Sequence, residues 1–221
     1  MLLAAGRGER LRPLTEHTPK ALVEVGGKPL IAWHLERLAA AGCREAVINV
    51  SHLAQKIIDH VADGRRFGLA VRYSREAEPL ETAGGIATAL PLLGNAPFLL
   101  VNADIYCEVP FRALLAHRLG AMLAHLVLVP NPAHRAKGDF SLVAGRIGDA
   151  AAPRYTYAGV AVMSPQLVAS VKGGVKAPLA PLLYDAAREE RLSGELYTGL
   201  WQDVGTLQRL SELAAQLASR I

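Results

Sequence analysis

The sequence predicts an α/β fold in which a mostly parallel sheet carries helices on both faces. Two observations predict it. Apolar segments of strand length alternate with amphipathic segments of helix length over about the first 125 residues, and such alternation normally forms right-handed strand–helix–strand crossovers. No internal repeat, low-complexity tract or long linker interrupts the chain, so we expect residues 1–221 to form one domain.

The first half of the chain contains elements that follow one another closely. Residues 29–42, PLIAWHLERLAAAG, place their leucines and Ile31 on one helical face and end near Gly42, a natural stop for a helix. The other elements expected here are strands at 45–50, 69–73 and 97–104, a helix at 53–63, and a helix that begins after the pair Gly84 and Gly85. The strand at 97–104, PFLLVNAD, is apolar enough to be buried on both faces of a parallel sheet.

Beyond about residue 125 the alternation becomes looser. The expected elements are strands at 125–131, 140–143 and 155–163 and helices at 178–191 and 206–220. We interpret this part as an addition to the same domain.

Composition restricts the class of function. With 51% apolar residues the chain can bury a substantial core. It has no apolar run near the ~20 residues of a membrane helix and no signal-peptide pattern, so we expect a cytoplasmic protein without a membrane partner. Cys43 and Cys107 lack metal-ligand spacing and are expected to be buried or idle thiols. The net charge of +4 suits a small anionic ligand, whereas the scattered lysines and arginines do not indicate a nucleic-acid partner.

The chain opens on a glycine-containing loop, MLLAAGRGERLRPLTEHTPK, directly after an apolar segment. A strand that runs into such a loop and then into a helix presents backbone N–H groups at the carboxyl edge of a sheet, where they can surround phosphate oxygens. A Walker loop is excluded because its Gly-Lys-Ser/Thr is absent. A dinucleotide loop is excluded because Leu11 stands in place of its third glycine.

The loop resembles the signature Gly-x-Gly-x-Arg-x-x-Pro-x-Thr…Pro-Lys of the sugar-1-phosphate nucleotidylyltransferases. The residues in register are Gly6, Gly8, Arg10, Pro13, Thr15, Pro19 and Lys20. The resemblance implies a Rossmann-like fold of the nucleotide-diphospho-sugar transferase type, with a nucleotide-binding half to about residue 125 and a sugar-binding half over about 126–221. It also implies two partners, a nucleoside triphosphate and a sugar-1-phosphate.

Nucleotidyl transfer joins these partners without a covalent enzyme intermediate. An oxygen of the sugar phosphate attacks the α-phosphorus, and pyrophosphate leaves in line. A phosphate monoester is largely dianionic at neutral pH and needs no general base. We expect Ala5, Gly6 and Gly8 to surround the triphosphate. Arg10 and Lys20 are the expected catalytic residues: Arg10 would hold the departing phosphates, and the resemblance assigns Lys20 to the α-phosphate and the incoming sugar phosphate.

So much negative charge favours Mg²⁺, which binds one or two carboxylates together with phosphate oxygens and water. Asp104 ends the apolar strand PFLLVNAD, where open α/β sheets bind ligands, and the less favoured alternative is a turn aspartate that caps the next segment. Asp203 in WQDVGT precedes a helix whose expected N-cap is Thr206, and alone it would be a cap-region carboxylate. The resemblance implies that both aspartates bind the metal.

The remaining candidates contact the nucleotide or the sugar. In EPLETAGGI, Glu78 or Glu81 could accept the imide N–H of a pyrimidine or the N1–H of guanine. Gly84 and Gly85 either let the backbone approach the base or form a tight turn. We also expect Asn102 to contact the nucleotide. Gly138, Asp139 and Glu195 are expected to contact the sugar.

Over nearly its whole length the chain resembles the short N-acetylmuramate α-1-phosphate uridylyltransferases of bacterial cell-wall recycling, for example in SGELYTGLWQDVGT. The resemblance implies UTP as the favoured nucleotide, and we expect a monomer. The alternatives are a mannose-1-phosphate guanylyltransferase and a catalytically silent regulatory protein that binds nucleotide sugars. The Glu-Lys-Pro acceptor motif of the thymidylyltransferases is absent, so the cation that holds the sugar phosphate stays open. Because the chain ends soon after its last helix, no β-helical acetyltransferase domain is expected.

Overall fold

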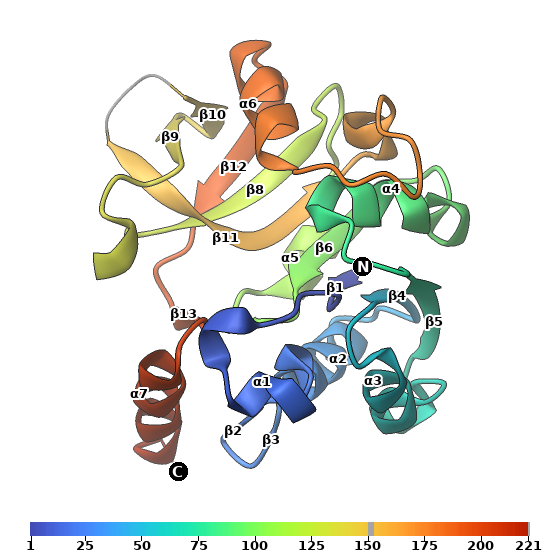
Figure 1. Ribbon diagram of the computed structural model, residues 1–221. Helices are drawn as coiled ribbons and strands as arrows, with labels where there is room; N and C mark the ends of the chain where they lie inside the picture. Colours follow the sequence, from blue (N-terminus) through green and yellow to red (C-terminus); the bar gives the residue numbers. More distant parts are fainter. Residues whose placement is uncertain (150–152, 221) are drawn as a thin grey trace. The chain divides into compact units, whose positions relative to one another are not determined.

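The computed structural model describes residues 1–149 and 153–220, shown in Figure 1. These residues form two compact units, each assembled from separate stretches of the chain. The first unit comprises Met1–Pro79, Asn102–Arg112 and Leu200–Ile221, and the second comprises Leu80–Val101 and Ala113–Gly199. Within the described ranges, no helix is both long and apolar enough to cross a membrane.

The sheet of the first unit is parallel. Its main elements, in chain order, are β1 (Leu2–Leu3), α2 (Leu30–Ala40), β4 (Glu45–Val50), α3 (Ala54–Val61) and β5 (Ala70–Arg75). Strand β4 pairs in parallel with both β1 and β5, and a helix connects each pair, as the predicted crossovers require. The predicted apolar face of α2 is buried, and Gly42 follows the helix with a positive φ of 95°.

Short elements complete the first unit. They are η1 (Glu9–Leu11), α1 (Leu14–His17), η2 (Lys20–Leu22), β2 (Glu24–Val25), β3 (Lys28–Pro29), η3 (Arg65–Phe67), β7 (Ile105–Cys107), β13 (Trp201–Asp203) and α7 (Leu207–Ala218). Strands β2 and β3 form a hairpin, and β13 pairs with β7 in antiparallel register. Leu213 and Leu217 of α7 join a buried cluster with Val23, Val25 and Leu30, so the last segment of the chain belongs to the core of this unit.

The second unit contains a mixed sheet. The elements that lie wholly or mainly in this unit are α4 (Glu81–Leu93), β6 (Phe98–Asn102), α5 (Phe111–Ala116), β8 (Ala124–Val129), η4 (Ala133–Arg135), β9 (Phe140–Val143), β10 (Arg146–Gly148), β11 (Arg154–Met163), η5 (Pro165–Val168), α6 (Ala180–Arg188) and β12 (Leu192–Leu196). Strand β11 is antiparallel to both β6 and β8, whereas β8 and β12 are parallel. The parallel order expected from the alternating pattern therefore holds in the first unit and gives way to mixed pairing in the second.

Helix α4 differs from the sequence prediction. It begins at Glu81, so Gly84 and Gly85 lie inside the helix, and the prediction that it begins after the pair is wrong. The backbone N–H of Gly84 donates to the carbonyl oxygen of Ala177 at 3.1 Å, and a Cβ on Gly84 would overlap the carbonyl oxygen of Val175. The absent side chain therefore lets the helix approach a neighbouring backbone segment.

Strand β12 has no counterpart among the predicted elements. Its sequence, LSGEL, has a central glycine and no long apolar run, so the usual strand signal is weak. The glycine is required because a Cβ on Gly194 would lie 2.6 Å from Ile147 Cδ1 and 2.7 Å from the carbonyl oxygen of Leu126. Close packing against adjacent strands therefore determines this residue.

Candidate active site

Buried polar side chains hold the start of the glycine loop in the first unit. The backbone N–H of Ala4 donates to Asn49 Oδ1 at 2.8 Å, and Asn49 Nδ2 donates to Glu76 Oε1 at 2.7 Å. Asn49 and Glu76 are only 3% and 6% exposed. Because buried polar groups are costly without partners, their hydrogen bonds to each other and to the loop favour one loop position. Neither residue belongs to a predicted motif. The available signal is the polar Asn49 within the apolar strand β4.

The glycine loop itself packs closely at one glycine and is open at the other. Gly8 has a φ of 67°, and Thr15 Oγ1 donates to its carbonyl oxygen at 2.8 Å. A Cβ on Gly8 would lie 2.9 Å from Thr15 Cγ2 and 3.2 Å from Lys20 Cβ, whereas a Cβ on Gly6 would have no atom within 4 Å. Gly8 therefore fixes the loop against the rest of the motif, and the space above Gly6 is open. Ala5 is buried.

Two of the predicted residues meet beside this loop. Lys20 begins η2, and its Nζ donates to Asp104 Oδ2 at 2.6 Å although the two residues are 84 positions apart. The backbone N–H of Ala103 donates to the carbonyl oxygen of Leu3 at 3.0 Å, which holds the segment that begins with Asn102 beside β1. The Lys20 side chain is 12% exposed and that of Asp104 is 40% exposed, so the carboxylate remains accessible.

The second predicted aspartate belongs to the adjacent backbone segment. Asp203 pairs with Ile105 across β13 and β7, and the backbone N–H of Val204 donates to the carbonyl oxygen of Asp104 at 3.0 Å. Asp203 Oδ1 lies 3.0 Å from Arg209 Nη1, and the two side chains are 20% and 10% exposed. The backbone pairing therefore brings the two acidic residues into neighbouring segments, and each carboxylate faces a cation.

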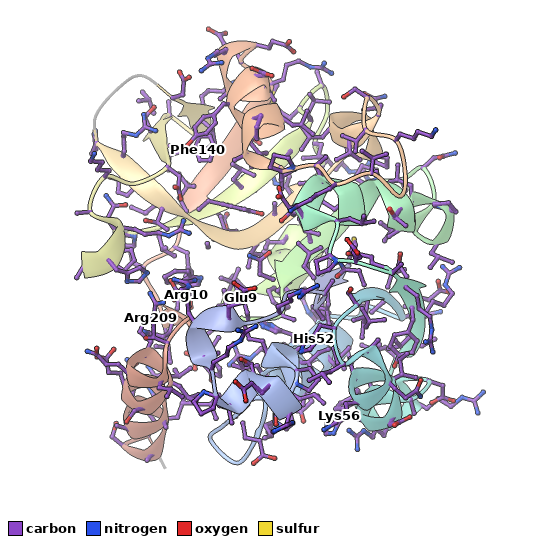
Figure 2. The ribbon with its side chains drawn as sticks, in the orientation of Figure 1. Glu9, Arg10, His52, Lys56, Phe140 and Arg209 are labelled. Atoms are coloured by element: carbon purple, nitrogen blue, oxygen red, sulfur yellow. The ribbon has the colours of Figure 1, made fainter. Side chains whose placement is uncertain are left out.

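Two arginines lie at the turn between β13 and α7. Figure 2 shows Arg10 beside Arg209. A Cβ on Gly205 would overlap Arg209 Nη2 and lie 3.0 Å from Arg10 Nη2. Arg10 is exposed and Arg209 is buried. Arg209 is not predicted from the sequence, because its six-residue spacing from Asp203 indicates a contact only once the turn at Thr206 is known.

The two carboxylates offer an incomplete ligand set for a metal ion. Among the described residues, no group of three or more histidine, cysteine, aspartate or glutamate side chains could hold a metal. Mg²⁺ does not need such a cage, because it usually binds one or two carboxylates and takes its other oxygens from phosphates and water. Carboxylate oxygens such as those of Asp104 and Asp203 are of the kind that Mg²⁺ binds together with a triphosphate, and binding of the metal by these two residues remains a prediction.

The residues predicted to contact the base are less closely grouped. Glu78 is an exposed loop residue of the first unit. Glu81 begins α4 in the second unit, where Oε1 lies 3.5 Å from Lys176 Nζ. Gly84 and Gly85 are buried inside α4. The close approach that Gly84 permits is to this chain's own backbone, so a nucleotide contact by either glycine remains a prediction.

The predicted sugar residues all lie in the second unit, in two clusters. Gly138 has a φ of 63°, and a Cβ there would lie 2.8 Å from the carbonyl carbon of Arg154. Asp139 Oδ2 accepts a hydrogen bond from the backbone N–H of Tyr157 at 2.8 Å and lies 3.3 Å from Arg135 Nη1.

The other cluster surrounds Glu195 on β12. Its Oε2 lies 3.7 Å from Nε2 of the buried His125. Burial and the neighbouring His117 ring, whose centroid is 3.9 Å away, lower the pKa of His125. Glu195 therefore contacts a histidine that tends to be neutral.

Comparison with known proteins identifies the class. Residues 1–138 match the family model described as nucleotidyl transferase. This match covers well over half of the chain and includes the glycine loop, Lys20 and Asp104. The chain belongs to the sugar-1-phosphate nucleotidyltransferase family.

Individual members of the family differ in how much of this chain they match. The chain is 48% identical to the N-acetylmuramate alpha-1-phosphate uridylyltransferase of Neisseria meningitidis serogroup B (strain ATCC BAA-335 / MC58), over 97% of this chain and 96% of that protein. It is 40% identical to the mannose-1-phosphate guanylyltransferase catalytic subunit beta of Drosophila melanogaster, over only 52% of this chain and 32% of that protein. A Bacillus anthracis protein described as a glucose-1-phosphate thymidylyltransferase and crystallised with sucrose shares the fold. Its TM-score is 0.85 at 18% identity, over 98% of this chain and 93% of that one.

Proposed function

We propose that the chain transfers the uridylyl group of UTP to N-acetylmuramate α-1-phosphate, giving UDP-N-acetylmuramate and pyrophosphate. One observation carries the substrate assignment: the identity with the Neisseria uridylyltransferase is 48% over 97% of the chain, whereas mannose-1-phosphate guanyltransferases reach 40% over only 52% of the chain or 30–31% over 93% of it. We further propose that the reaction depends on Mg²⁺. The protein would be cytoplasmic and monomeric and would act in the recycling of bacterial cell wall.

The residues around the glycine loop support the transfer step. In this step an oxygen of the sugar phosphate forms a bond to the α-phosphorus while the bond from that phosphorus to the β-phosphate oxygen breaks. Lys20 Nζ would stabilise the negative charge that develops on the α-phosphate in the transition state. Arg10, which is exposed on η1, would hold the β- and γ-phosphates as they leave. Asp104 and Asp203 would hold Mg²⁺, which neutralises part of the triphosphate charge when bound.

The loop geometry supports a role in triphosphate binding. Gly8 is fixed by Thr15, and the buried Asn49 fixes the chain four residues earlier, at Ala4. A loop held at both points keeps its N–H groups in place before the ligand arrives, so less conformational entropy is lost on binding. The open position at Gly6 leaves room for phosphate oxygens.

The acceptor is the part of the proposal most open to test. N-acetylmuramate carries a lactyl carboxylate that N-acetylglucosamine lacks, so its site should present a cation. The segment NPAHRAKGDF contains His134, Arg135 and Lys137 beside Gly138 and Asp139. Because Arg135 is already paired with Asp139 at 3.3 Å, the exposed Lys137 is the first cation to test.

The experiment measures pyrophosphate release with a panel of nucleoside triphosphates and sugar-1-phosphates. We expect kcat/KM for UTP with N-acetylmuramate-1-phosphate to exceed that for UTP with N-acetylglucosamine-1-phosphate by at least about 10-fold, a difference of roughly 1.4 kcal/mol in transition-state binding. Lys137→Ala should reduce this preference, whereas Arg118→Ala, at an exposed residue of the same unit, should leave it unchanged. Equal rates with the two sugars would show that the muramate assignment is wrong. A preference for GTP and mannose-1-phosphate would show that the protein is a guanylyltransferase instead.

A catalytically silent sensor of nucleotide sugars is the alternative from another class. The presence of Arg10, Lys20, Asp104 and Asp203 together in one unit argues against it, since a binding protein needs no paired cation and carboxylate at the α-phosphate. Binding of UDP-sugars without pyrophosphate release from any pair in the panel would establish the sensor instead.

A further inference from the structure

Arg209 is a buried charged residue that has no role in the proposed reaction as described so far. It is the third residue of α7, it is 8% exposed, and its backbone N–H donates to the N-cap oxygen of Thr206 at 3.3 Å. Its Nη1 lies 3.0 Å from Asp203 Oδ1. Its Nε is buried and, among the described residues, has no hydrogen-bond partner. Buried ion pairs contribute little net stability because desolvation offsets their attraction, so a stabilising role explains this arginine poorly.

A second guanidinium shares the same turn. Arg10 Nη2 and Arg209 Nη2 both lie close to the Cβ position of Gly205, two residues after Asp203. Across the described part of the chain, Arg10 makes no ion pair or hydrogen bond with a carboxylate. It is exposed, and thus able to move toward the Asp203 carboxylate if that group were not already paired.

We propose that Arg209 is a positioning residue of the transfer site. It holds the Asp203 carboxylate in one orientation through Nη1 and, by occupying that carboxylate, keeps Arg10 from pairing with it. The Asp203 carboxylate is thereby held in one orientation for the divalent cation, and Arg10 stays available for the departing phosphates. The inference rests on the proposed function in one respect, namely that Asp203 is a ligand of that cation.

The expected effect follows from the two contacts. Without the guanidinium at residue 209, the Asp203 carboxylate loses this ion pair and can attract Arg10, so a metal ligand and a phosphate contact are weakened together. Removing a partner that orients a metal ligand commonly costs about 10–100-fold in metal affinity or activity. We therefore expect Arg209→Met to raise the dissociation constant for the metal by at least about 10-fold.

The direct test measures metal binding and does not depend on turnover. The full chain is titrated with Mn²⁺ in the presence of α,β-methylene-UTP, and free Mn²⁺ is followed by electron paramagnetic resonance. Wild type is compared with Arg209→Met, Arg209→Lys and Asp203→Asn. Arg220→Met is the matched control, because Arg220 is exposed after the end of α7 and pairs with Glu108 at 2.9 Å. We expect Arg209→Met, Arg209→Lys and Asp203→Asn to bind Mn²⁺ more weakly than wild type, with the smallest loss of affinity for Arg209→Lys. The control should bind Mn²⁺ as wild type does.

A variant that keeps every charge gives an independent test. Gly205→Ala introduces a methyl group that overlaps Arg209 Nη2, the end of a flexible side chain, so the chain should still fold while the guanidinium is displaced. We expect Mn²⁺ binding between that of wild type and Arg209→Met, together with a lower kcat and a KM for the sugar phosphate that changes little. Thermal unfolding of each variant shows that it is folded.

Two results overturn the proposal. If Arg209→Met and Gly205→Ala lower the melting temperature but bind Mn²⁺ as wild type does, while Asp203→Asn binds it weakly, Arg209 is only structural and the proposed function stands. If Asp203→Asn also binds Mn²⁺ normally, Asp203 is no metal ligand, and that part of the proposed function fails together with the inference. Should Arg209→Met not fold, Arg209→Lys and Gly205→Ala decide between these outcomes.

Discussion

His34 should make the stability of the protein depend on pH. It lies in α2, is 1% exposed, and has Nε2 2.7 Å from the carbonyl oxygen of Ile105, the residue after Asp104. The neutral ring therefore donates from Nε2 to this carbonyl. Burial, above all, lowers the pKa of His34 from 6.5 to about 4.

The size of the effect follows from proton linkage. Below pH 6.5 the unfolded chain binds a proton at His34, whereas the folded chain binds it only near pH 4. The folded state is thus fully favoured above the unfolded pKa, and its stability falls as the pH is lowered toward the folded pKa. The whole shift corresponds to about 3 kcal/mol, of which about 2 kcal/mol is lost between pH 7 and pH 5.

The assay is urea unfolding at several pH values between 7 and 5. His34→Gln keeps an N–H that can reach the Ile105 carbonyl but cannot titrate, so its free energy of unfolding should fall by about 2 kcal/mol less than that of wild type over this range. The exposed His134→Gln should follow wild type. His60 and His125 also have lowered pKa values, so some decline remains in every variant. An identical decline in wild type and His34→Gln would refute the reasoning.

Four further outcomes are expected. Lys20→Ala should lower kcat by about 10²-fold or more and change KM little, because its contact strengthens in the transition state; an effect on KM alone in pyrophosphate-release assays would mean simple binding. Asp104→Asn should fold normally and lose a similar factor, since the amide fits but brings no charge to Mg²⁺, and full turnover in EDTA would contradict this. Gly84→Ala should destabilise the protein by about 1–3 kcal/mol in thermal unfolding, because its Cβ would overlap the carbonyl oxygen of Val175. Cys107 is 1% exposed and burial raises its pKa to about 11, so maleimide should label it only on unfolding, as mass spectrometry can show.

Much of the fold could be predicted because local patterns determine it. The periodic apolar residues of α2 and the mainly apolar sequences of β4 and β6 indicate directly that these elements are buried. The start of α4 and the strand β12 could not be predicted in this way. Their glycines are selected by contacts with residues distant in the sequence, Val175 for Gly84 and Leu126 for Gly194, and a single sequence does not reveal such contacts.

In the candidate site, too, the residues of local motifs could be predicted and those defined by distant contacts could not. The motifs name Arg10, Lys20, Asp104 and Asp203, and the structure brings Lys20 to Asp104 and Asp203 to the segment after Asp104. The roles of these residues in binding and catalysis remain predictions. Spacing alone does not identify Arg209, nor the buried Asn49 and Glu76, because their partners become neighbours only when strands pair and turns form.

The first unit is completed only by the third of its stretches, Leu200–Ile221, which is synthesised after the whole of the second unit. Its three stretches supply Lys20, Asp104 and Asp203 in turn, and the chain passes through the second unit between each of them. A nascent chain still lacking residue 200 and beyond has neither Asp203 nor the leucines of α7 that cover Val23, Val25 and Leu30. Contacts between such distant residues form slowly, and uncovered apolar surface promotes aggregation in the meantime. We therefore expect a chain that stops before residue 200 to aggregate more readily than the chain of residues 1–221 and to release no pyrophosphate.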